Sequence, residues 1–288
     1  MRAVRRQSLE FTKMHGAGND YVYVDARAMD EDWPALSAAM SERHTGIGAD
    51  GLILALESDR ADLRMRMFNA DGSEGEMCGN GIRCLVAFAL TRGIIPKYTS
   101  PVLVETLAGD LEVTPTWHGD QVVWAKVGMG EPRLAVEDIP IALDDRAMVM
   151  DYPITIDGVT FEINAVSMGN PHAVAFVDQP VDDIPLERLG PLVEHHPLFP
   201  KRVNFEIVNV IDKGHVKVRV WERGSGETMA CGTGACAVGV ISRLKRRVKG
   251  DDVTVSLPGG DLIVRWSGEG EVILEGPVVE VFTGHWKS

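Results

Sequence analysis

An internal repeat constrains this chain more than any other feature. Residues 63–68 and the Gly-rich turn after them lead to Cys78-Gly-Asn-Gly81, and residues 216–221 lead in the same way to Cys231-Gly-Thr-Gly234. The offset between the two cysteines is 153 residues (231 − 78). A repeat at this spacing in a chain of 288 residues indicates two copies of one domain, because each copy is large enough to bury its own core.

Each copy predicts a strand, a turn and a helix in that order. The residues before the Gly-rich turn alternate apolar and polar, which is the period of a half-buried strand. After the turn, residues 82–90 and 235–244 are apolar densely enough for a helix with most of its surface buried. Short β-rich runs recur at 102–106, 121–127, 253–257 and 271–274. We therefore expect an α/β protein of the α+β type, in which two similar domains each wrap a curved, mostly antiparallel sheet around one central helix.

The repeat also sets the domain boundaries. A weaker match pairs the runs around Asn19 and Asn170, at an offset of 151 residues (170 − 19). A Gly- and Pro-rich cluster at 128–132 follows a predicted strand and indicates a junction. We expect an N-terminal domain at residues 1–130 and a C-terminal domain at 131–277. The last predicted strand, 278–282, is expected to return to the first domain, so that residues 278–288 complete it.

The charge balance excludes several classes of partner. Asp and Glu number 42 against 29 Lys and Arg, and the net charge of −13 is repelled by nucleic acid and by anionic lipid. No run approaches the ~20 apolar residues of a membrane span, and the basic residues 1–8 precede no apolar segment. We expect a cytoplasmic protein that binds neither nucleic acid nor membrane. Its four cysteines are too few for a disulfide scaffold.

The repeated cysteines are the strongest candidates for chemistry. Cys78 and Cys231 each stand where a helix is predicted to begin, and the N–H groups of a helix N-terminus favour anions. A free thiol has a pKa of roughly 8.5, which such surroundings can lower to between about 3.5 and 7.5. Both thiols could then act as bases near neutral pH. The glycines after each cysteine let a ligand approach the backbone closely.

Two thiols on opposite sides of one carbon suit a particular reaction. Inversion of a stereocentre removes a proton from one face and returns one to the other, so it needs a base and an acid in mirrored positions. Two domain copies facing each other across a cleft would supply both. The hypothesis needs no metal and no cofactor, since helix N-termini can stabilise the negative charge that develops on the substrate.

Other candidate residues have ordinary explanations. Cys84 and Cys236 lie within the predicted helices, where burial is the usual role of a free cysteine. His172 and Glu222 could reach the cleft, yet a core histidine and a solvated glutamate are equally good interpretations. His195-His196 is expected in a surface loop, and no spacing of His and Cys indicates a zinc site.

A dinucleotide-binding fingerprint is present only formally. Gly46-Ile-Gly-Ala-Asp-Gly51 matches the pattern of glycines, but it follows a helix-like segment at 33–42 and precedes a strand-like one at 52–56. The functional motif must follow a strand and open a helix. We therefore do not expect a dinucleotide cofactor.

These residues resemble the diaminopimelate epimerase family, cofactor-independent enzymes of lysine and peptidoglycan precursor synthesis. The resemblance covers nearly the whole chain. It implies two similar α/β domains with the active site in the interdomain cleft, and a two-base thiol mechanism that converts LL-2,6-diaminopimelate to the meso isomer. The matching motifs are residues 16–20, 43–50, 68–73, 77–83, 166–172, 203–204, 221–223 and 230–234.

The resemblance assigns roles residue by residue. The family's two acid/base cysteines correspond to Cys78 and Cys231, and its residues that assist the thiols correspond to His172 and Glu222. Arg223 can pair with a carboxylate, and Asn side chains both donate and accept, as an amino acid zwitterion requires. The implied substrate contacts are Asn19, Asn69, Gly79, Asn80, Asn170, Asn204, Glu222, Arg223, Gly232 and Thr233.

One family contact is missing, because many members have Gln where this chain has Gly51. Two rival functions also remain open. Proline and hydroxyproline racemases share the duplicated fold, but they tend to carry His at the place of Asn80 and Pro at that of Ala230. A zinc-binding or redox-switch protein would use the two repeated cysteines as a pair. The resemblance also allows a homodimer, which nothing in the sequence demands.

Overall fold

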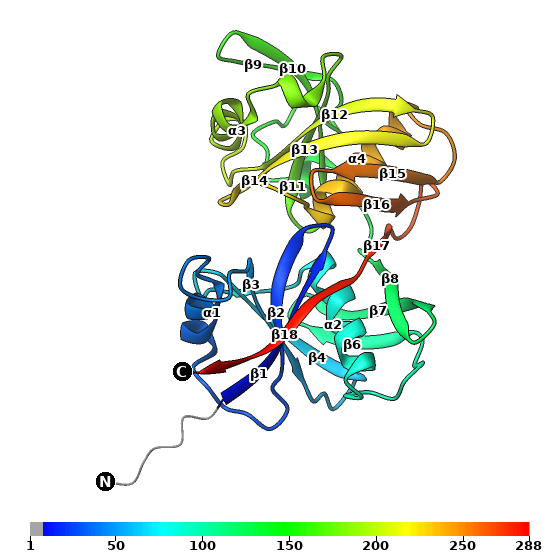
Figure 1. Ribbon diagram of the computed structural model, residues 1–288. Helices are drawn as coiled ribbons and strands as arrows, with labels where there is room; N and C mark the ends of the chain where they lie inside the picture. Colours follow the sequence, from blue (N-terminus) through cyan, green and yellow to red (C-terminus); the bar gives the residue numbers. More distant parts are fainter. Residues whose placement is uncertain (1–7, 288) are drawn as a thin grey trace. The chain divides into compact units, whose positions relative to one another are not determined.

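A computed structural model describes residues 8–287 of the chain (Figure 1). The basic residues 1–7, on which part of the expected localisation rests, lie outside the described residues, as does Ser288. The fold divides into two compact units. Unit 1 runs to Val127 and resumes at Gly276, and unit 2 is Gly128–Glu275.

Unit 1 is a sheet with two helices. Its strands lie in the order β18, β1, β2, β3, β4, β6, β7, β8, and the short β5 pairs with β4 beside β6. All neighbours are antiparallel except β2 with β3 and β4 with β6. Its elements are β1 Ser8–Gly16, β2 Asn19–Asp25, α1 Trp33–Ser41, β3 Gly51–Leu56, β4 Leu63–Asn69, β5 Glu74–Gly75, α2 Gly79–Thr91, β6 Val102–Thr106, β7 Gly109–His118, β8 Gln121–Gly128 and β18 Val279–Lys287.

Unit 2 repeats this order. Its strands run β9, β10, β11, β12, β13, β15, β16, β17, with β14 paired to β13 beside β15. The parallel neighbours are β11 with β12 and β13 with β15, at the same two places as in unit 1. Its elements are 3-10 helix η1 Val136–Asp138, β9 Tyr152–Ile156, β10 Val159–Ser167, β11 Pro171–Phe176, 3-10 helix η2 Val181–Asp183, α3 Leu186–Glu194, β12 Asn204–Asp212, β13 His215–Glu222, β14 Gly226–Thr228, α4 Gly232–Leu244, β15 Asp252–Leu257, β16 Gly260–Arg265 and β17 Ile273–Pro277.

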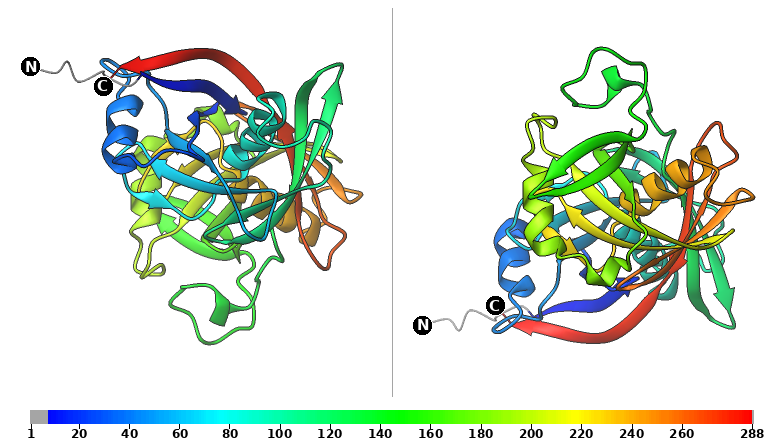
Figure 2. Two further views of the ribbon diagram at one scale, coloured as in Figure 1. Left: turned by 90° about the horizontal axis from the view of Figure 1, so that it is seen from below. Right: turned by 90° about the horizontal axis from the view of Figure 1, so that it is seen from above.

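The predicted fold class is confirmed: two similar domains each combine a mostly antiparallel sheet with a central helix. Every residue from Gly79 to Leu90 of α2 is buried, and α2 packs on β1, β2, β3 and β7 (Figure 2). The corresponding helix α4 packs on β10, β11, β12, β15 and β16. A helix buried all round is expected to be mostly apolar, which is the pattern the sequence carries after each Gly-rich turn.

Alternation along β3 separates two layers in unit 1. Leu52 and Leu54 belong to the core beneath α1, together with Trp33 and Met40. Ile53 faces the opposite way, and its Cδ1 lies under the first turn of α2. Side chains of a strand point alternately to the two faces of its sheet, so α1 and α2 cover opposite faces.

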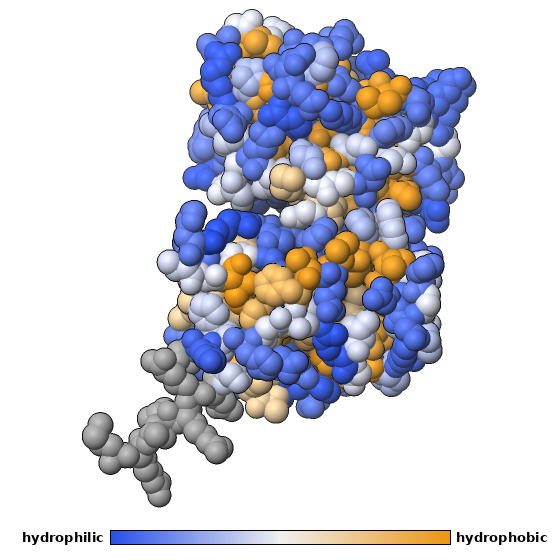
Figure 3. Space-filling model, viewed as in Figure 1, coloured by the Kyte–Doolittle hydropathy of each residue, from blue (hydrophilic) through white to orange (hydrophobic). Residues whose placement is uncertain are grey.

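The final strand lies at the edge of unit 1. β18 pairs antiparallel with β1, and the red and blue strands run side by side in both views of Figure 2. Val279, Val281 and Phe282 of this strand are 39%, 53% and 45% exposed. The space-filling view shows hydrophobic residues on the face of unit 1 that β18 crosses (Figure 3).

The loop that carries the formal dinucleotide fingerprint joins α1 to β3. It therefore follows a helix and precedes a strand, as the sequence predicts, whereas the functional motif follows a strand and opens a helix. Among the helices of residues 8–287, none is long and apolar enough to cross a bilayer.

Candidate active site

Cys78 is the N-cap of α2. Its backbone is extended (φ −131°, ψ 120°), and its Sγ accepts the N–H of Gly81 at 3.4 Å. The thiol also donates to Asn19 Oδ1 at 3.2 Å. The next residue in the helix, Gly79, is the first helical position, where N–H groups have no partner within the helix. The expected combination of a thiol with the N–H groups of a helix N-terminus is therefore present at the start of α2.

Asn19 is held in place by charged neighbours. Its Nδ2 donates to Asp50 Oδ2 at 2.7 Å, so its carbonyl oxygen faces Cys78 and the amide of Asn80 at 3.4 Å. Arg43 bonds Asp50 at 3.0 Å from the exposed side. Burial raises the pKa of Asp50, as does the nearby Asp20 carboxylate. The structure thus brings together three predicted contacts, Asn19, Cys78 and Asn80.

A buried guanidinium lies beside the first turn of α2. Arg83 is 0% exposed and donates to Gly79 O at 3.0 Å and to Asn80 Oδ1 at 2.9 Å. A Cβ at Gly16 would come within 3.1 Å of its Nη2, so β1 also packs closely against it. Burial raises the pKa of Tyr21, and the neighbouring Cys78 thiol raises it further. The first half-site, as we call the residues of unit 1 around Cys78, therefore includes a phenol with a raised pKa, and a buried cation lies beside the first turn of the same helix.

Cys231 is the N-cap of α4 with nearly the same geometry. Its backbone is extended (φ −116°, ψ 114°), and its Sγ accepts the N–H of Gly234 at 3.3 Å. Thr233 Oγ1 lies 3.5 Å from the sulfur. Burial raises the pKa of Cys231 well above its usual value, and Glu222 and Glu206 raise it further. The sequence-based expectation of a lowered pKa is therefore wrong for this thiol, because burial and two carboxylates outweigh the helix N-terminus.

His172 and Glu206 form a buried pair behind Cys231. Both side chains are 0% exposed, and His172 Nδ1 lies 2.6 Å from Glu206 Oε1. His172 Nε2 lies 3.0 Å from Asn170 Oδ1, and Asn170 Nδ2 donates to Thr233 Oγ1 at 3.3 Å. Burial raises the pKa of Glu206, and His172 opposes that rise. A continuous chain of polar contacts thus joins the buried carboxylate to the neighbourhood of the thiol.

The remaining polar residues of unit 2 lie at the ends of β12 and β13. Glu222, the last residue of β13, accepts a hydrogen bond from Thr228 Oγ1 at 2.5 Å. Asn204 Nδ2 donates to Pro171 O at 2.9 Å, and its Oδ1 accepts the N–H of Arg223 at 2.8 Å. The Arg223 side chain is exposed and reaches Lys201 O at 3.2 Å. Its guanidinium is therefore accessible to a ligand carboxylate.

The other predicted substrate contacts lie at the first residues of α2 and α4 and at the end of β4. Gly232 is the first helical residue after Cys231, as Gly79 is after Cys78. Asn69, at the end of β4, is exposed and donates to Ser73 Oγ at 3.0 Å. It is the register partner of Gly51, so it lies at the same sheet end as the start of β3.

The structure also bears on the sequence-based expectations for Cys84, Cys236 and Gly51. Cys84 and Cys236 are both 0% exposed, which confirms their assignment to the helix cores. Burial raises the pKa of Cys84 to about 11. A Cβ at Gly51 would lie 2.1 Å from Phe68 O, so the strand pairing at this point leaves no room for the side chain of a Gln.

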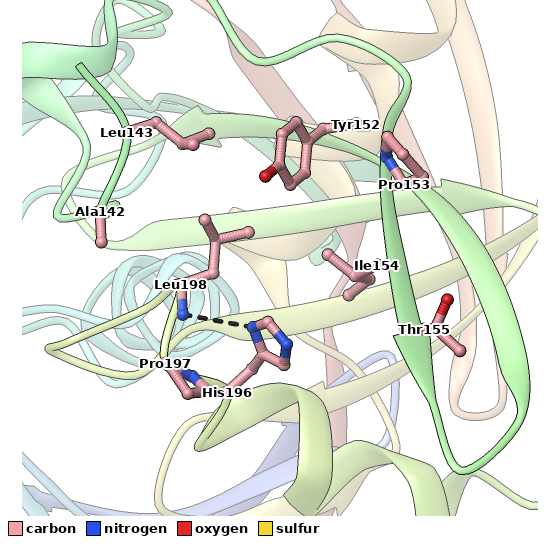
Figure 4. A pocket seen from close by; sticks show the side chains of 9 residues that line it. All are labelled: Ala142, Leu143, Tyr152, Pro153, Ile154, Thr155, His196, Pro197 and Leu198. Carbon is pink, nitrogen blue, oxygen red and sulfur yellow. Dashed lines mark hydrogen bonds between the residues drawn. The ribbon is translucent and has the colours of Figure 1, made fainter. Parts of the chain in front are cut away.

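A pocket of unit 2 lies away from these residues. It has a volume of about 410 Å³ and contains none of the predicted site residues (Figure 4). His196 faces it and accepts the N–H of Leu198 at 3.2 Å, while His195 ends α3 on the surface, which confirms the surface position predicted for His195. Within residues 8–287, no group of three or more His, Cys, Asp or Glu is arranged to hold a metal ion. The pocket is lined by Ala142, Leu143, Tyr152, Pro153, Ile154, Thr155, His196, Pro197 and Leu198.

Sequence reasoning missed two buried charges. Glu206 lies within the apolar strand β12 and Arg83 within the apolar helix α2. Charged side chains are almost never fully buried unless they are paired, so a lone charge in an apolar run was the available signal. A lone charged residue in an apolar run predicts that its side chain is paired with another group, but it does not identify that group.

The chain matches a known family over most of its length. The diaminopimelate epimerase family model matches residues 11–135 and 164–281. The chain is 51% identical over 278 residues to a diaminopimelate epimerase of Acetivibrio thermocellus, covering 96% of this chain and 98% of that one. It is 50% identical to a diaminopimelate epimerase of Methanococcus maripaludis, covering 96% and 99%.

Solved structures share the fold at low identity. A phenazine biosynthesis protein of the PhzF family from Bacillus anthracis superposes with a TM-score of 0.69 at 17% identity, covering 97% of this chain and 99% of that one. A probable proline racemase from Agrobacterium radiobacter superposes with a TM-score of 0.66 at 14% identity, covering 96% and 92%. At such identities the likeness concerns the fold alone.

Proposed function

The chain belongs to the diaminopimelate epimerase family, and from this premise we propose that Cys78 and Cys231 are the acid and base with which it converts LL-2,6-diaminopimelate to the meso isomer. As a member of this family it is an isomerase that acts on a small molecule. The proposal adds a place in lysine and peptidoglycan precursor synthesis, and it assigns chemistry to individual side chains.

The reaction inverts one α-carbon. The thiolate of one cysteine takes the α-proton from one face, and the thiol of the other gives a proton to the opposite face. The electron pair left by the first proton forms the new C–H bond, so the enzyme finishes with its two protonation states exchanged. The reverse reaction starts from that exchanged state. The mechanism thus requires both sulfurs to reach the same substrate carbon from opposite sides.

The negative charge of the intermediate must be stabilised next to the reacting carbon. Gly79 and Gly232 begin the two helices, and their N–H groups, with those of the residues that follow, suit the α-carboxylate. Arg223 offers an exposed guanidinium for a carboxylate, and the Asn side chains can donate or accept at the ammonium and carboxylate groups. Glu222 raises the pKa of Cys231, and His172 belongs to the chain of polar contacts that leads towards this thiol, which supports an assisting role for both.

One observation carries the proposal. Two thiols stand in the same backbone conformation at the N-termini of two equivalent helices, each accepting the N–H of the glycine three residues later. A buried structural cysteine needs no such position. Duplication of the thiol together with its donors supports a reaction that treats two faces of one carbon alike.

The test is hydrogen exchange. Reduced protein, stripped of metal, is incubated with LL-diaminopimelate in D₂O, with proline and hydroxyproline in parallel tubes. We expect deuterium at the α-carbon of diaminopimelate and formation of the meso isomer. Exchange into a proline compound instead would move the protein to the racemases, and exchange into none by fully reduced protein would reject the proposal.

A second experiment tests whether both thiols reach one small ligand. Mild oxidation of the substrate-free protein should join Cys78 to Cys231 and abolish activity, and a reductant should restore it. Peptide mass spectrometry identifies the bond. Full activity in protein that carries this disulfide would contradict the two-thiol mechanism.

The proposal includes a cytoplasmic location and a homodimer. The net charge of −13 supports an enzyme that stays away from anionic lipid. The exposed hydrophobic side chains of β18 support self-association, because apolar patches on a protein surface mark interaction sites. Sedimentation equilibrium of the parent protein and of Phe282→Lys tests the second point: a monomeric parent, or a variant that dimerises equally well, would reject it.

A further inference from the structure

Unit 2 contains a buried carboxylate that the proposed reaction leaves without a task. Glu206 lies on β12 and is 0% exposed. One oxygen, Oε1, contacts His172 Nδ1 at 2.6 Å, while Oε2 is buried with no hydrogen-bond partner. Burying a carboxylate so incompletely paired is costly, which indicates a role beyond packing.

The carboxylate lies directly under the turn that holds Cys231. A Cβ added at Gly234 would be 2.9 Å from Glu206 Oε1, and the N–H of Gly234 is the donor to Cys231 Sγ. The glycine therefore allows the acid to approach the first turn of α4. Glu206 is placed where its charge acts on the sulfur through about one turn of helix.

His172 connects the same carboxylate to the thiol through a second route. Its Nε2 lies 3.0 Å from Asn170 Oδ1, an acceptor, and this contact suits a proton on that nitrogen. Its Nδ1 shares the second contact with Glu206, which fixes the orientation of the ring. The chain continues through Asn170 and Thr233 to within 3.5 Å of the sulfur.

The titratable groups near Cys231 come from three strands of unit 2 and from α4. β11 contributes His172, β12 contributes Glu206 and β13 contributes Glu222, while Cys236 lies farther along α4 itself. Two of these four groups are carboxylates, and a negative charge nearby disfavours a thiolate.

We propose that Glu206 is a positioning residue of the second half-site, the residues of unit 2 around Cys231. Glu206 orients His172 and keeps the proton on Cys231 in the substrate-free protein. The inference rests on the proposed two-thiol function, in which one sulfur must begin as the acid. Glu206 touches neither substrate nor the reacting sulfur, and it acts through His172 and through its charge. Unit 1 has no such device at the equivalent place, since Ile53 Cδ1 occupies the space beneath Gly81.

The experiment measures the ionisation of each thiol in the absence of substrate. Reduced protein is pulse-labelled with iodoacetamide from pH 5 to pH 10, and the peptides of Cys78 and Cys231 are quantified by mass spectrometry. Glu206→Gln keeps the shape of the side chain and removes its charge. The matched control is Glu162→Gln, which removes an exposed carboxylate from β10 of the same unit.

We expect Glu206→Gln to shift the labelling midpoint of Cys231 down by roughly one pH unit, which is about a tenfold rise in labelling rate below the midpoint. Cys78 and both thiols of Glu162→Gln should keep the parent profile. Midpoints are compared rather than rates, because the two sulfurs differ in access to solvent. An unchanged Cys231 midpoint in Glu206→Gln, or an equal shift at Cys78, would overturn the inference.

A second measurement keeps the inference open to refutation even if Glu206→Gln does not fold. Long-range ¹H–¹⁵N correlation spectra of the parent protein report which nitrogens of His172 carry protons. We expect a proton on Nε2 near neutral pH, and an unprotonated Nε2 would overturn the inference. Neither measurement uses substrate, so a protein that fails to exchange diaminopimelate but shows both results would reject the proposed function and retain the role of Glu206 toward its thiol.

Discussion

The surroundings of Cys78 and of Cys231 differ in charge although their backbones match. Both sulfurs cap a buried helix and accept the N–H of a glycine three residues later. Beneath the first turn, however, unit 1 places the apolar Ile53 and unit 2 places the carboxylate of Glu206. The backbone donors have thus been kept in both copies, and the ionisable side chains around them have diverged.

The neighbouring strands and helices extend the contrast. The residue on the second strand is Tyr21 in unit 1 and His172 in unit 2, since each is the register partner of the first residue of the next strand. Arg83 of α2 corresponds to Cys236 of α4, at the same offset of 153 residues (236 − 83). Such divergence suits a pair of thiols that must begin in opposite protonation states, because identical surroundings would give identical ionisation.

The largest effect is expected from removal of either thiol. Cys78→Ala and Cys231→Ala should each lower the epimerisation rate by roughly 10³-fold or more, since an obligatory acid or base is lost. The α-proton exchange assay in D₂O measures both. Cys84→Ala, which removes a buried thiol outside the half-sites, is the control and should keep the parent rate to within about twofold. If Cys78→Ala or Cys231→Ala kept the parent rate, the cysteine removed in that variant would not be an obligatory acid or base.

The next effect concerns a position at which unit 2 has a side chain and unit 1 has no room for one. Unit 2 carries Asn204 where unit 1 carries Gly51, and a Cβ at Gly51 would collide with Phe68 O at 2.1 Å. We expect Gly51→Ala to lower the free energy of unfolding by about 2–4 kcal/mol, because a strand must shift. Gly214→Ala, where the added Cβ would meet only Asp212 Oδ1 at an ordinary contact distance of 3.9 Å, should change it by less than about 0.5 kcal/mol. Urea denaturation measures both, and equal midpoints would show that β3 and β4 can separate freely.

A smaller loss is expected at the exposed guanidinium. Arg223 follows Glu222 in unit 2, while unit 1 has Ala70 at the equivalent place after Asn69. Arg223→Lys keeps the charge and removes the planar fork, so KM for diaminopimelate should rise by about tenfold or more while the fold is unchanged. Steady-state kinetics on the variant separate KM from kcat. An unchanged KM would mean that this cation does not bind a substrate carboxylate.

The smallest effect distinguishes the cores of the two helices in alkaline solution. Cys84 of α2 has Ala237 as its counterpart in α4, and burial raises the pKa of Cys84 from 9.0 to about 11. The folded state therefore holds this proton more tightly than the unfolded state, and the associated stability is present below pH 9 and lost as pH rises towards 11.

Between pH 8 and pH 10, the free energy of unfolding of the parent protein should therefore fall by about 1 kcal/mol more than that of Cys84→Ala. Denaturant titrations at both pH values give the difference. Because the other alkaline groups are common to both proteins, parallel pH profiles would show that the Cys84 thiol keeps its ordinary pKa when folded.

Much of the repeated strand, turn and helix arrangement, the frame of each unit, was predictable from sequence because it depends on local patterns. The alternation before each Gly-rich turn and the dense apolar run after it predicted β4 with α2 and β13 with α4. The repeat of Cys-Gly-x-Gly predicted that both thiols begin helices, and the structure has each as an N-cap. Propensity, period and capping act over a few residues, so one copy of the motif is enough to reveal them.

The tertiary structure decided which charges surround each thiol. His172 and Glu206 are 34 residues apart and meet only because β11 and β12 pair in parallel at one register. The same pairing buries both, and burial with Glu222 raises the pKa of Cys231, the opposite of what a helix N-terminus alone predicts. Sequence therefore determined the repeated frame and the family, while strand register and desolvation, which act between distant residues, decided how each sulfur holds its proton.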